Sequence, residues 1–131
     1  MKANELRLGN CIRQEGKDYQ LDENSLIDIL DHWKIFKKVL FQPIPITKEW
    51  LEKFGFELWD INPPKWVLHN IIDGTSDFEI TLQDGKAYAS IDDNACCWAK
   101  ELHVHHLQNL YYSLVGEELM MNIIDDDYYH K

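Results

Sequence analysis

Two Asp-Gly pairs constrain the fold of this chain more than any other feature of its sequence. The pairs are Asp73-Gly74 and Asp84-Gly85. They separate three runs that favour extended backbone, at 66–72, 78–82 and 87–91. An Asp-Gly pair favours a tight turn with positive φ at both positions, whose twist matches that of two antiparallel strands. The sequence therefore predicts an antiparallel β-meander of three strands.

The chain before the meander predicts a small N-terminal β element and two short helices. Apolar and polar residues alternate over 6–14 with an interruption at Gly9, and a short strand follows at 19–21. Helical spacing then recurs in the apolar residues Leu26, Ile29, Leu30 and Trp33. Two prolines bias 43–46 toward extended geometry and exclude a central strand. Thr47 is a good N-cap for a second helix over 48–54.

Between this second helix and the meander, Asn62-Pro63-Pro64 predicts a connection. A C-terminal helix is predicted by an apolar stripe at helical spacing: Val104, Leu107, Leu110, Tyr111, Leu114 and Val115. Gly116 either ends or interrupts that helix. The expected fold is one α+β domain over 1–131, with a β-meander packed by the C-terminal helix and a frayed acidic tail at 125–131.

The charge of the chain is uneven. Its 131 residues carry a net charge of −10. Residues 1–65 hold ten Lys and Arg against eleven Asp and Glu, whereas residues 66–131 hold three against twelve. A broad phosphate-binding surface needs Lys and Arg, so we expect no direct binding of nucleic acid. With 12% aromatic residues, intrinsic disorder is also not expected.

Cellular location is predicted from the cysteines and the N-terminus. The three cysteines, Cys11, Cys96 and Cys97, form no disulfide framework and fit reduced thiols. The first residues lack the apolar core of a secretory signal, and no run approaches the length of a membrane span. We therefore expect a cytoplasmic protein that does not enter a membrane.

Histidines at the start of the C-terminal helix are the first candidates for chemistry. Helical spacing makes His103 and His106 neighbours, and likewise Glu101 and His105. Imidazole and carboxylate on one face could begin a metal site for a hydrolase or nuclease. No further ligand motif completes it, so we favour the alternative that these are exposed polar residues on the first helical turn.

The other catalytic fragments also remain incomplete. The adjacent Cys96 and Cys97 have no fixed base and are better interpreted as core residues. Asp92 and Asp93 lie in a turn, where aspartates more often accept hydrogen bonds from backbone amides than act as acid and base. Phosphate-binding glycine loops and nucleophile elbows are missing from the sequence. The sequence predicts neither an enzyme nor a cofactor.

Candidate interaction residues are acidic or aromatic. Tyr112 lies off the apolar stripe and should approach solvent, where tyrosine is common in interfaces. The other candidates are acids of the second half: Asp92, Asp93, Glu117 and Glu118. Together they predict contact with another protein.

Residues 43–56 (PIPITKEWLEKFGF) resemble a "PIPLTEEWLLKFGF" block, and residues 104–119 (VHHLQNLYYSLVGEEL) resemble a closing "VHQLQNLYFALTGEEL" block. Both blocks are typical of a family of small uncharacterised proteins encoded in genomes and prophages of gut Bacteroidetes. The opening 1–10 (MKANELRLGN) is similar to the family's usual start. His106 departs from the family's frequent glutamine. The resemblance implies a phage or mobile-element origin and carries over no activity, cofactor or catalytic residue.

These observations favour a non-enzymatic protein–protein interaction or regulatory module that binds its partner through the acidic half. A variant is that the acidic half mimics nucleic acid and occupies a basic site on another protein. The alternative from another class is the metal-dependent hydrolase or nuclease, using Glu101, His103, His105 or His106. A homo-oligomer formed by the C-terminal helix is a further possibility.

Overall fold

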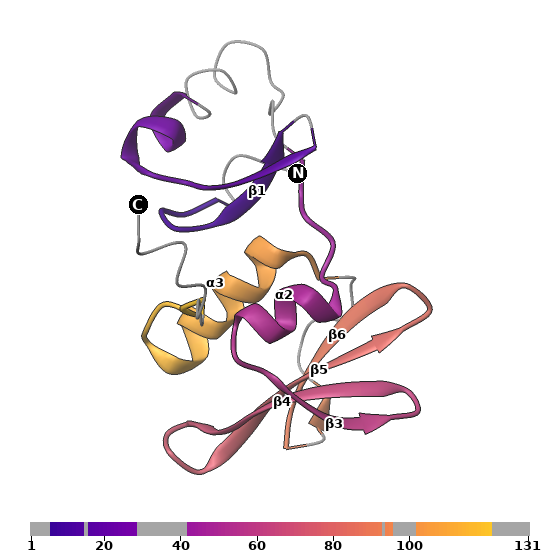
Figure 1. Ribbon diagram of the computed structural model, residues 1–131. Helices are drawn as coiled ribbons and strands as arrows, with labels where there is room; N and C mark the ends of the chain where they lie inside the picture. Colours follow the sequence, from indigo (N-terminus) through magenta and orange to yellow (C-terminus); the bar gives the residue numbers. More distant parts are fainter. Residues whose placement is uncertain (1–5, 15, 29–41, 93, 96–101, 122–131) are drawn as a thin grey trace, which may run out of the picture.

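An antiparallel sheet, two helices on one of its faces and an N-terminal hairpin make up the described chain (Figure 1). The computed structural model describes residues 6–14, 16–28, 42–92, 94–95 and 102–121. The elements are, in chain order, β1 (Cys11–Gln14), β2 (Lys17–Gln20), α2 (Lys48–Lys53), β3 (Glu57–Ile61), β4 (Pro64–Ile72), β5 (Ser76–Gln83), β6 (Lys86–Ile91), β7 (Asn94–Ala95) and α3 (Val104–Val115). Residues 23–28 are also helical. The predicted α+β class is confirmed.

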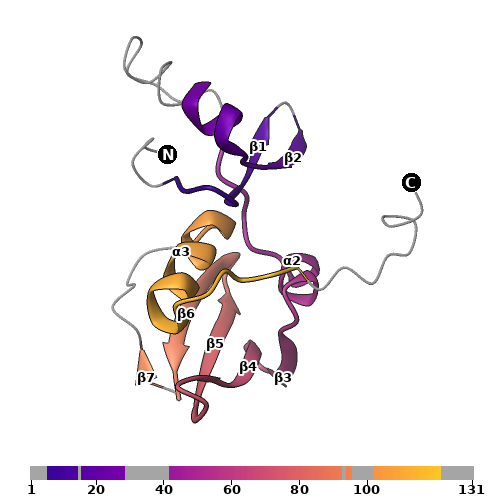
Figure 2. The ribbon, with the colours of Figure 1, turned by 90° about the vertical axis from the view of Figure 1, so that its left-hand side faces the viewer.

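The elements form three layers. Figures 1 and 2 show the large sheet at the bottom, α2 and α3 above it, and the β1–β2 hairpin on the far side of α3. Helix α3 therefore lies between the hairpin and the sheet. Within the described residues, no helix is long and apolar enough to cross a membrane.

The sheet has the strand order β3-β4-β5-β6-β7, with every neighbouring pair antiparallel. Its three central strands are the predicted meander. At the β5–β6 turn, Asp84 and Gly85 have φ of 55° and 75°, and Gln83 pairs with Lys86. That is the two-residue turn that Asp-Gly favours.

The sheet has an edge strand on each side that the sequence did not predict. Strand β3 pairs with β4, so Asn62 and Pro63 form a hairpin turn and Pro64 begins β4. Proline is tolerated as the first residue of a strand. The register shifts between Leu58 and Asp60, which makes Trp59 the extra residue of a β-bulge. Strand β7 is only two residues long.

The core lies between the sheet and the two helices. Strand β5 contributes Phe78 and Ile80, which are fully buried, and the Phe78 ring lies 6.2 Å from that of Tyr111 on α3. Helix α2 contributes Leu51, also fully buried, and a neighbouring Trp50. Burying one such side chain contributes about 1.5–3 kcal/mol to folding.

The predicted ends of the helices are confirmed. Thr47 is the N-cap of α2, and its hydroxyl accepts a hydrogen bond from the Trp50 amide at 3.4 Å. Gly116 has φ +82° and ends α3, which decides between the two possibilities for this glycine. A residue without Cβ adopts this left-handed backbone at the lowest cost.

The predicted N-terminal β element is present with other bounds: β1 covers only the end of the run 6–14, and β2 begins two residues before the predicted strand 19–21. Strands β1 and β2 pair, and Gly9 has φ +85° just before β1. The run 43–46 and the residue before it connect the layers. Gln42 bridges Arg13 of β1, and the Val104 amide donates to the Ile44 carbonyl at 2.9 Å. The C-terminal part of the helix predicted from Leu26 to Trp33, and the tail 125–131, lie outside the described residues.

Candidate functional site

The histidines occupy the capped start of α3 and not one of its exposed faces. His103 is the N-cap residue, and its amide donates to Nδ1 of His106 at 3.1 Å. His105 is fully buried. The expectation of exposed polar residues on the first turn is therefore wrong for His105. The start of α3 is packed inside the molecule, and the proline-rich run lies alongside it, with Pro45 bridging His103 and Ile44 accepting from the Val104 amide.

The three imidazoles are close, but their arrangement is not that of a metal site. Ring centroids lie 4.0 Å apart for His105 and His106, and 5.4 Å apart for His103 and His106. Among the described residues, no group of three or more His, Cys, Asp and Glu side chains is placed to hold a metal ion. Glu101 lies outside those residues, so the metal hypothesis stays a prediction.

Asp92 accepts a hydrogen bond from a backbone amide, which is the role that the turn sequence favours. Its carboxylate accepts from the Asp77 amide at 2.8 Å. This bond, with a further one from Ser76, lowers the pKa of the Asp92 carboxyl. Asp93 and the cysteines Cys96 and Cys97 lie outside the described residues.

Tyr112 and Glu118 meet around one arginine, which the sequence alone did not indicate. The Arg7 guanidinium donates to Glu118 at 2.7 Å and lies 4.5 Å from the centre of the Tyr112 ring. Tyr112 remains 44% exposed. Two of the predicted interaction residues therefore also bind the N-terminal segment to α3 and its C-terminal continuation. Glu117 is exposed.

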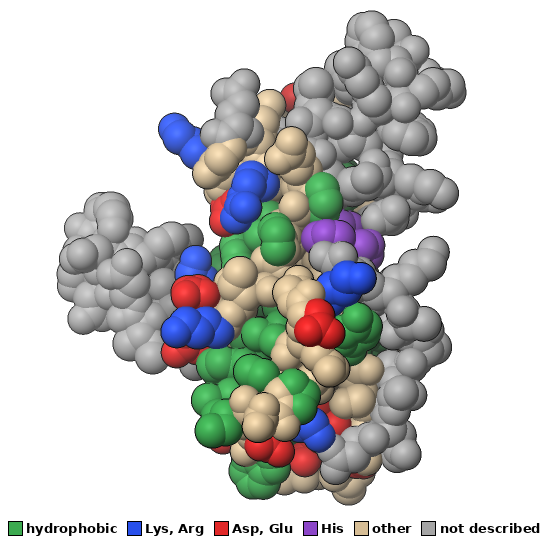
Figure 3. Space-filling view, turned by 90° about the vertical axis from the view of Figure 1, so that its right-hand side faces the viewer, with side chains coloured by type: hydrophobic (Ala, Val, Ile, Leu, Met, Phe, Trp, Pro, Cys, Tyr) green, Lys and Arg blue, Asp and Glu red, His purple; other side chains and the backbone are tan. Residues whose placement is uncertain are grey.

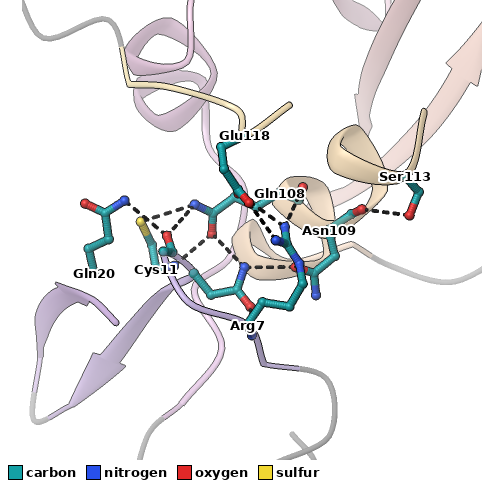
Figure 4. A network of polar contacts seen from close by, with 9 residues as sticks. Arg7, Cys11, Gln20, Gln108, Asn109, Ser113 and Glu118 are labelled. Carbon is teal, nitrogen blue, oxygen red and sulfur yellow. Dashed lines mark hydrogen bonds and ion pairs between the residues drawn. The ribbon is translucent and has the colours of Figure 1, made fainter. Parts of the chain in front are cut away.

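A polar network joins the hairpin to α3 (Figure 4). The Gln108 side chain, 2% exposed, accepts from the Cys11 amide at 2.8 Å and donates to the Gly9 carbonyl at 2.9 Å. Asn109 accepts from Arg7 at 2.7 Å and from Asn10 at 2.9 Å. Buried polar groups with satisfied hydrogen bonds fix one relative position of two elements.

The three segments that carry the family resemblance converge on α3. The opening block supplies Arg7 and Asn10 to the network, and the closing block supplies Gln108 and Asn109. The middle block contacts the start of the same helix through Ile44. A structural role therefore accounts for several residues of the blocks.

The acids of the second half do not form one continuous face in the described part of the chain. In an antiparallel meander alternate turns lie at the same end, so Asp73 and Asp92 share one end of the sheet and Asp84 lies at the other. Glu79 is buried and accepts from the Ser90 hydroxyl at 2.7 Å. This distribution does not favour mimicry of a phosphate backbone.

Strand β3 presents the most prominent apolar surface of the described chain. Three large apolar side chains are unusually exposed there: Leu58 at 48%, Trp59 at 66% and Ile61 at 73%. Beside them lies a pocket of about 370 Å³, lined by Thr47, Lys48, Glu49, Leu58, Ile61, Pro64, Trp66 and Leu82. Figure 3 shows hydrophobic side chains gathered on this end of the molecule.

Trp59 also contacts a histidine between two carboxylates. Its ring meets that of His69 edge-on, with centroids 4.7 Å apart. The His69 nitrogens lie 3.7 Å from a Glu57 oxygen and 3.5 Å from an Asp77 oxygen. Trp59, His69 and the two carboxylates therefore form one cluster of side chains on β3, β4 and β5.

Sequence reasoning missed this surface because it treated Asn62-Pro63-Pro64 as a connection between elements. A usable signal was present: the apolar residues Leu58, Trp59 and Ile61 directly precede a turn sequence and an apolar run.

Comparisons of the chain with protein-family models, curated proteins and solved structures find no match.

Proposed function

We propose that this chain is a non-enzymatic protein–protein interaction module, of the phage or mobile-element origin that the family resemblance implies. One observation carries the proposal: Leu58 and Ile61 are exposed on one face of the edge strand β3 beside an apolar pocket, and Trp59 is exposed on the other face of the same strand. A contiguous exposed apolar patch on a protein domain commonly marks an interaction site.

The proposed binding surface differs from the acidic half favoured by the sequence. Among the described acids of that half, Asp73 and Asp92 lie at one end of the sheet and Asp84 at the other, whereas Leu58 and Ile61 line one pocket. Burying a fully exposed side chain of this size in an interface contributes about 1.5–3 kcal/mol to the binding free energy. A partly exposed side chain contributes in proportion to its exposed fraction. Three such side chains can therefore supply a useful part of a binding free energy.

The test compares two apolar residues of equal exposure at different places. Ile61 on β3 is 73% exposed and Met120 after α3 is 74% exposed. Immobilised wild-type chain, Ile61→Asp and Met120→Asp are each incubated with lysate of the cell that encodes the chain, and retained proteins are identified by mass spectrometry. We expect wild type and Met120→Asp to retain the same protein and Ile61→Asp to lose it. Capture of nothing, or equal capture by all three, would contradict the proposal.

A further inference from the structure

The inner face of β3 is apolar because of the bulge at Trp59. Leu58 pairs with Trp66, and Ile61 pairs with Pro64. Cross-strand partners project to the same face of a sheet. The extra residue of the bulge therefore leaves Leu58 and Ile61 on one face although they are three positions apart, and both line the pocket.

The opposite face of the same strand offers a carboxylate and an aromatic ring. Glu57 pairs with Val67 on that face, and its side chain is 72% exposed. Trp59 reaches His69 there, with its indole 66% exposed. A carboxylate next to an exposed indole suits a Lys or Arg side chain, through charge attraction and a cation–π contact.

We propose that β3 binds an extended segment of a partner protein in which aliphatic and basic side chains alternate. This inference rests on the proposed function and names the partner's chemistry. Side chains of an extended chain point alternately to opposite sides. A segment along the outer edge of β3 therefore places its aliphatic side chains toward the pocket and its basic ones toward Glu57 and Trp59.

The size of the pocket agrees with side chains as its occupants. Its volume of about 370 Å³ is near the lower end of the roughly 300–1,000 Å³ found for small-molecule sites. Its walls are mostly apolar, with Lys48 and Glu49 contributing one charge of each sign. One or two aliphatic side chains would replace water against these walls.

Charge disfavours a second copy of the chain as the occupant. Strand β3 contains two carboxylates, Glu57 and Asp60, and neither Lys nor Arg. The Glu57 side chain is 72% exposed although it lies 3.7 Å from His69, so it can still meet a basic side chain of a partner. A second copy would bring the same acidic strand and another net charge of −10. A basic segment instead gains from the attraction of the whole chain.

The probes are two seven-residue peptides, one alternating lysine with leucine and one alternating glutamate with leucine. Each is titrated into the ¹⁵N-labelled full chain, and the indole N–H signals of Trp59 and Trp66 are followed by NMR. We expect the lysine peptide to shift both signals and the glutamate peptide to shift neither. Light scattering without peptide measures any self-association.

Variants then separate the two faces of β3. Glu57→Gln should weaken binding of the lysine peptide about two- to fivefold, as loss of an exposed ion pair does. Ile61→Ser should weaken it about tenfold or more, because the aliphatic contact is lost. The matched controls Glu23→Gln and Met120→Ser alter exposed residues of the same kind elsewhere and should leave binding unchanged.

Three results would overturn the inference: equal binding of both peptides, unchanged affinity in Ile61→Ser, or a dimer that Ile61→Ser dissociates. If the lysine peptide fails to bind while capture from lysate still depends on Ile61, the partner chemistry is wrong and the interaction module stands. If both experiments fail, the proposed function falls as well.

Discussion

The pKa of the Cys11 thiol is raised because the side chain is buried. Its side chain is 2% exposed and belongs to the larger hydrophobic cluster, where β1 meets α3. Burial disfavours the thiolate and is the main reason that the pKa of Cys11 rises from 9.0 to about 11. A bond from Gln108 acts in the opposite direction and is the smaller effect. The thiol is therefore protonated and unreactive near neutral pH.

Cys11 predicts a loss of stability in alkali. Because the folded-state pKa lies above the unfolded value of 9.0, the contribution of this thiol to stability is fully present below about pH 9. It is lost as the pH rises through about 11. The measurement is the free energy of unfolding in urea from pH 8 to 11. Wild type should lose more stability over this range than Cys11→Ala, and parallel profiles would contradict the prediction.

Gln108 shows what a residue-level pattern can and cannot predict. It lies four positions after Val104, so it falls on the apolar stripe of α3. A glutamine on such a stripe is a signal for a buried polar contact. Its partners could not be predicted, because Gly9 and Cys11 lie about a hundred residues earlier in the chain and no local periodicity relates them.

At the scale of elements, the sequence predicted those that local rules determine. The meander follows from its Asp-Gly turns, and α2 follows from the cap at Thr47. Strand β3 was missed because all five of its residues are exposed, so it has no buried face to produce the usual alternation. The burial of His105 was missed because burial depends on tertiary packing around the start of α3, which the helical spacing does not reveal.

Because Gln108 joins the hairpin to α3, we expect the substitution Gln108→Leu to lower the free energy of unfolding substantially. This change leaves the buried Cys11 amide without the acceptor that it has at 2.8 Å. An unsatisfied buried donor costs about 1–3 kcal/mol. We expect a decrease of that size in the free energy of unfolding, measured by urea denaturation.

The control is Gln20→Ala, because Gln20 donates to the same Gly9 carbonyl from an exposed position, at 3.1 Å. That carbonyl keeps its bond from Gln108, so the control should cost less than about 0.5 kcal/mol, as ordinary surface changes do. Equal effects of the two substitutions would show that the network does not dock the hairpin.

At the scale of the whole molecule, the described residues form two hydrophobic clusters of unequal size. The larger fills the space between the sheet and the helices. The smaller contains only three buried residues, Leu6, Ile12 and Leu21, with Leu26 packed against it. Because the smaller cluster buries little apolar surface, the polar network provides much of what positions the hairpin.

Unequal clusters predict unequal protection from hydrogen exchange. Amides of β1 should exchange through local opening of the hairpin at a lower free energy than amides of β5. Substitution Asn109→Ala, which removes acceptors for Arg7 and Asn10, should speed exchange in β1 and leave β5 unchanged. Exchange monitored by NMR measures both. A common free energy of opening for β1 and β5 would contradict the prediction.

The position of α3 between hairpin and sheet also affects folding during synthesis. Ribosomes make the chain from its N-terminus, so residues 6–92 emerge before Val104–Val115. Until then the hairpin lacks Gln108 and the sheet lacks the Tyr111 ring that lies against Phe78. Neither layer can pack until α3 has been made. If translation stalls before that point, the nascent chain exposes the apolar surface of its sheet and becomes prone to aggregation and proteolysis. Translation of one helix thus completes two interfaces at once.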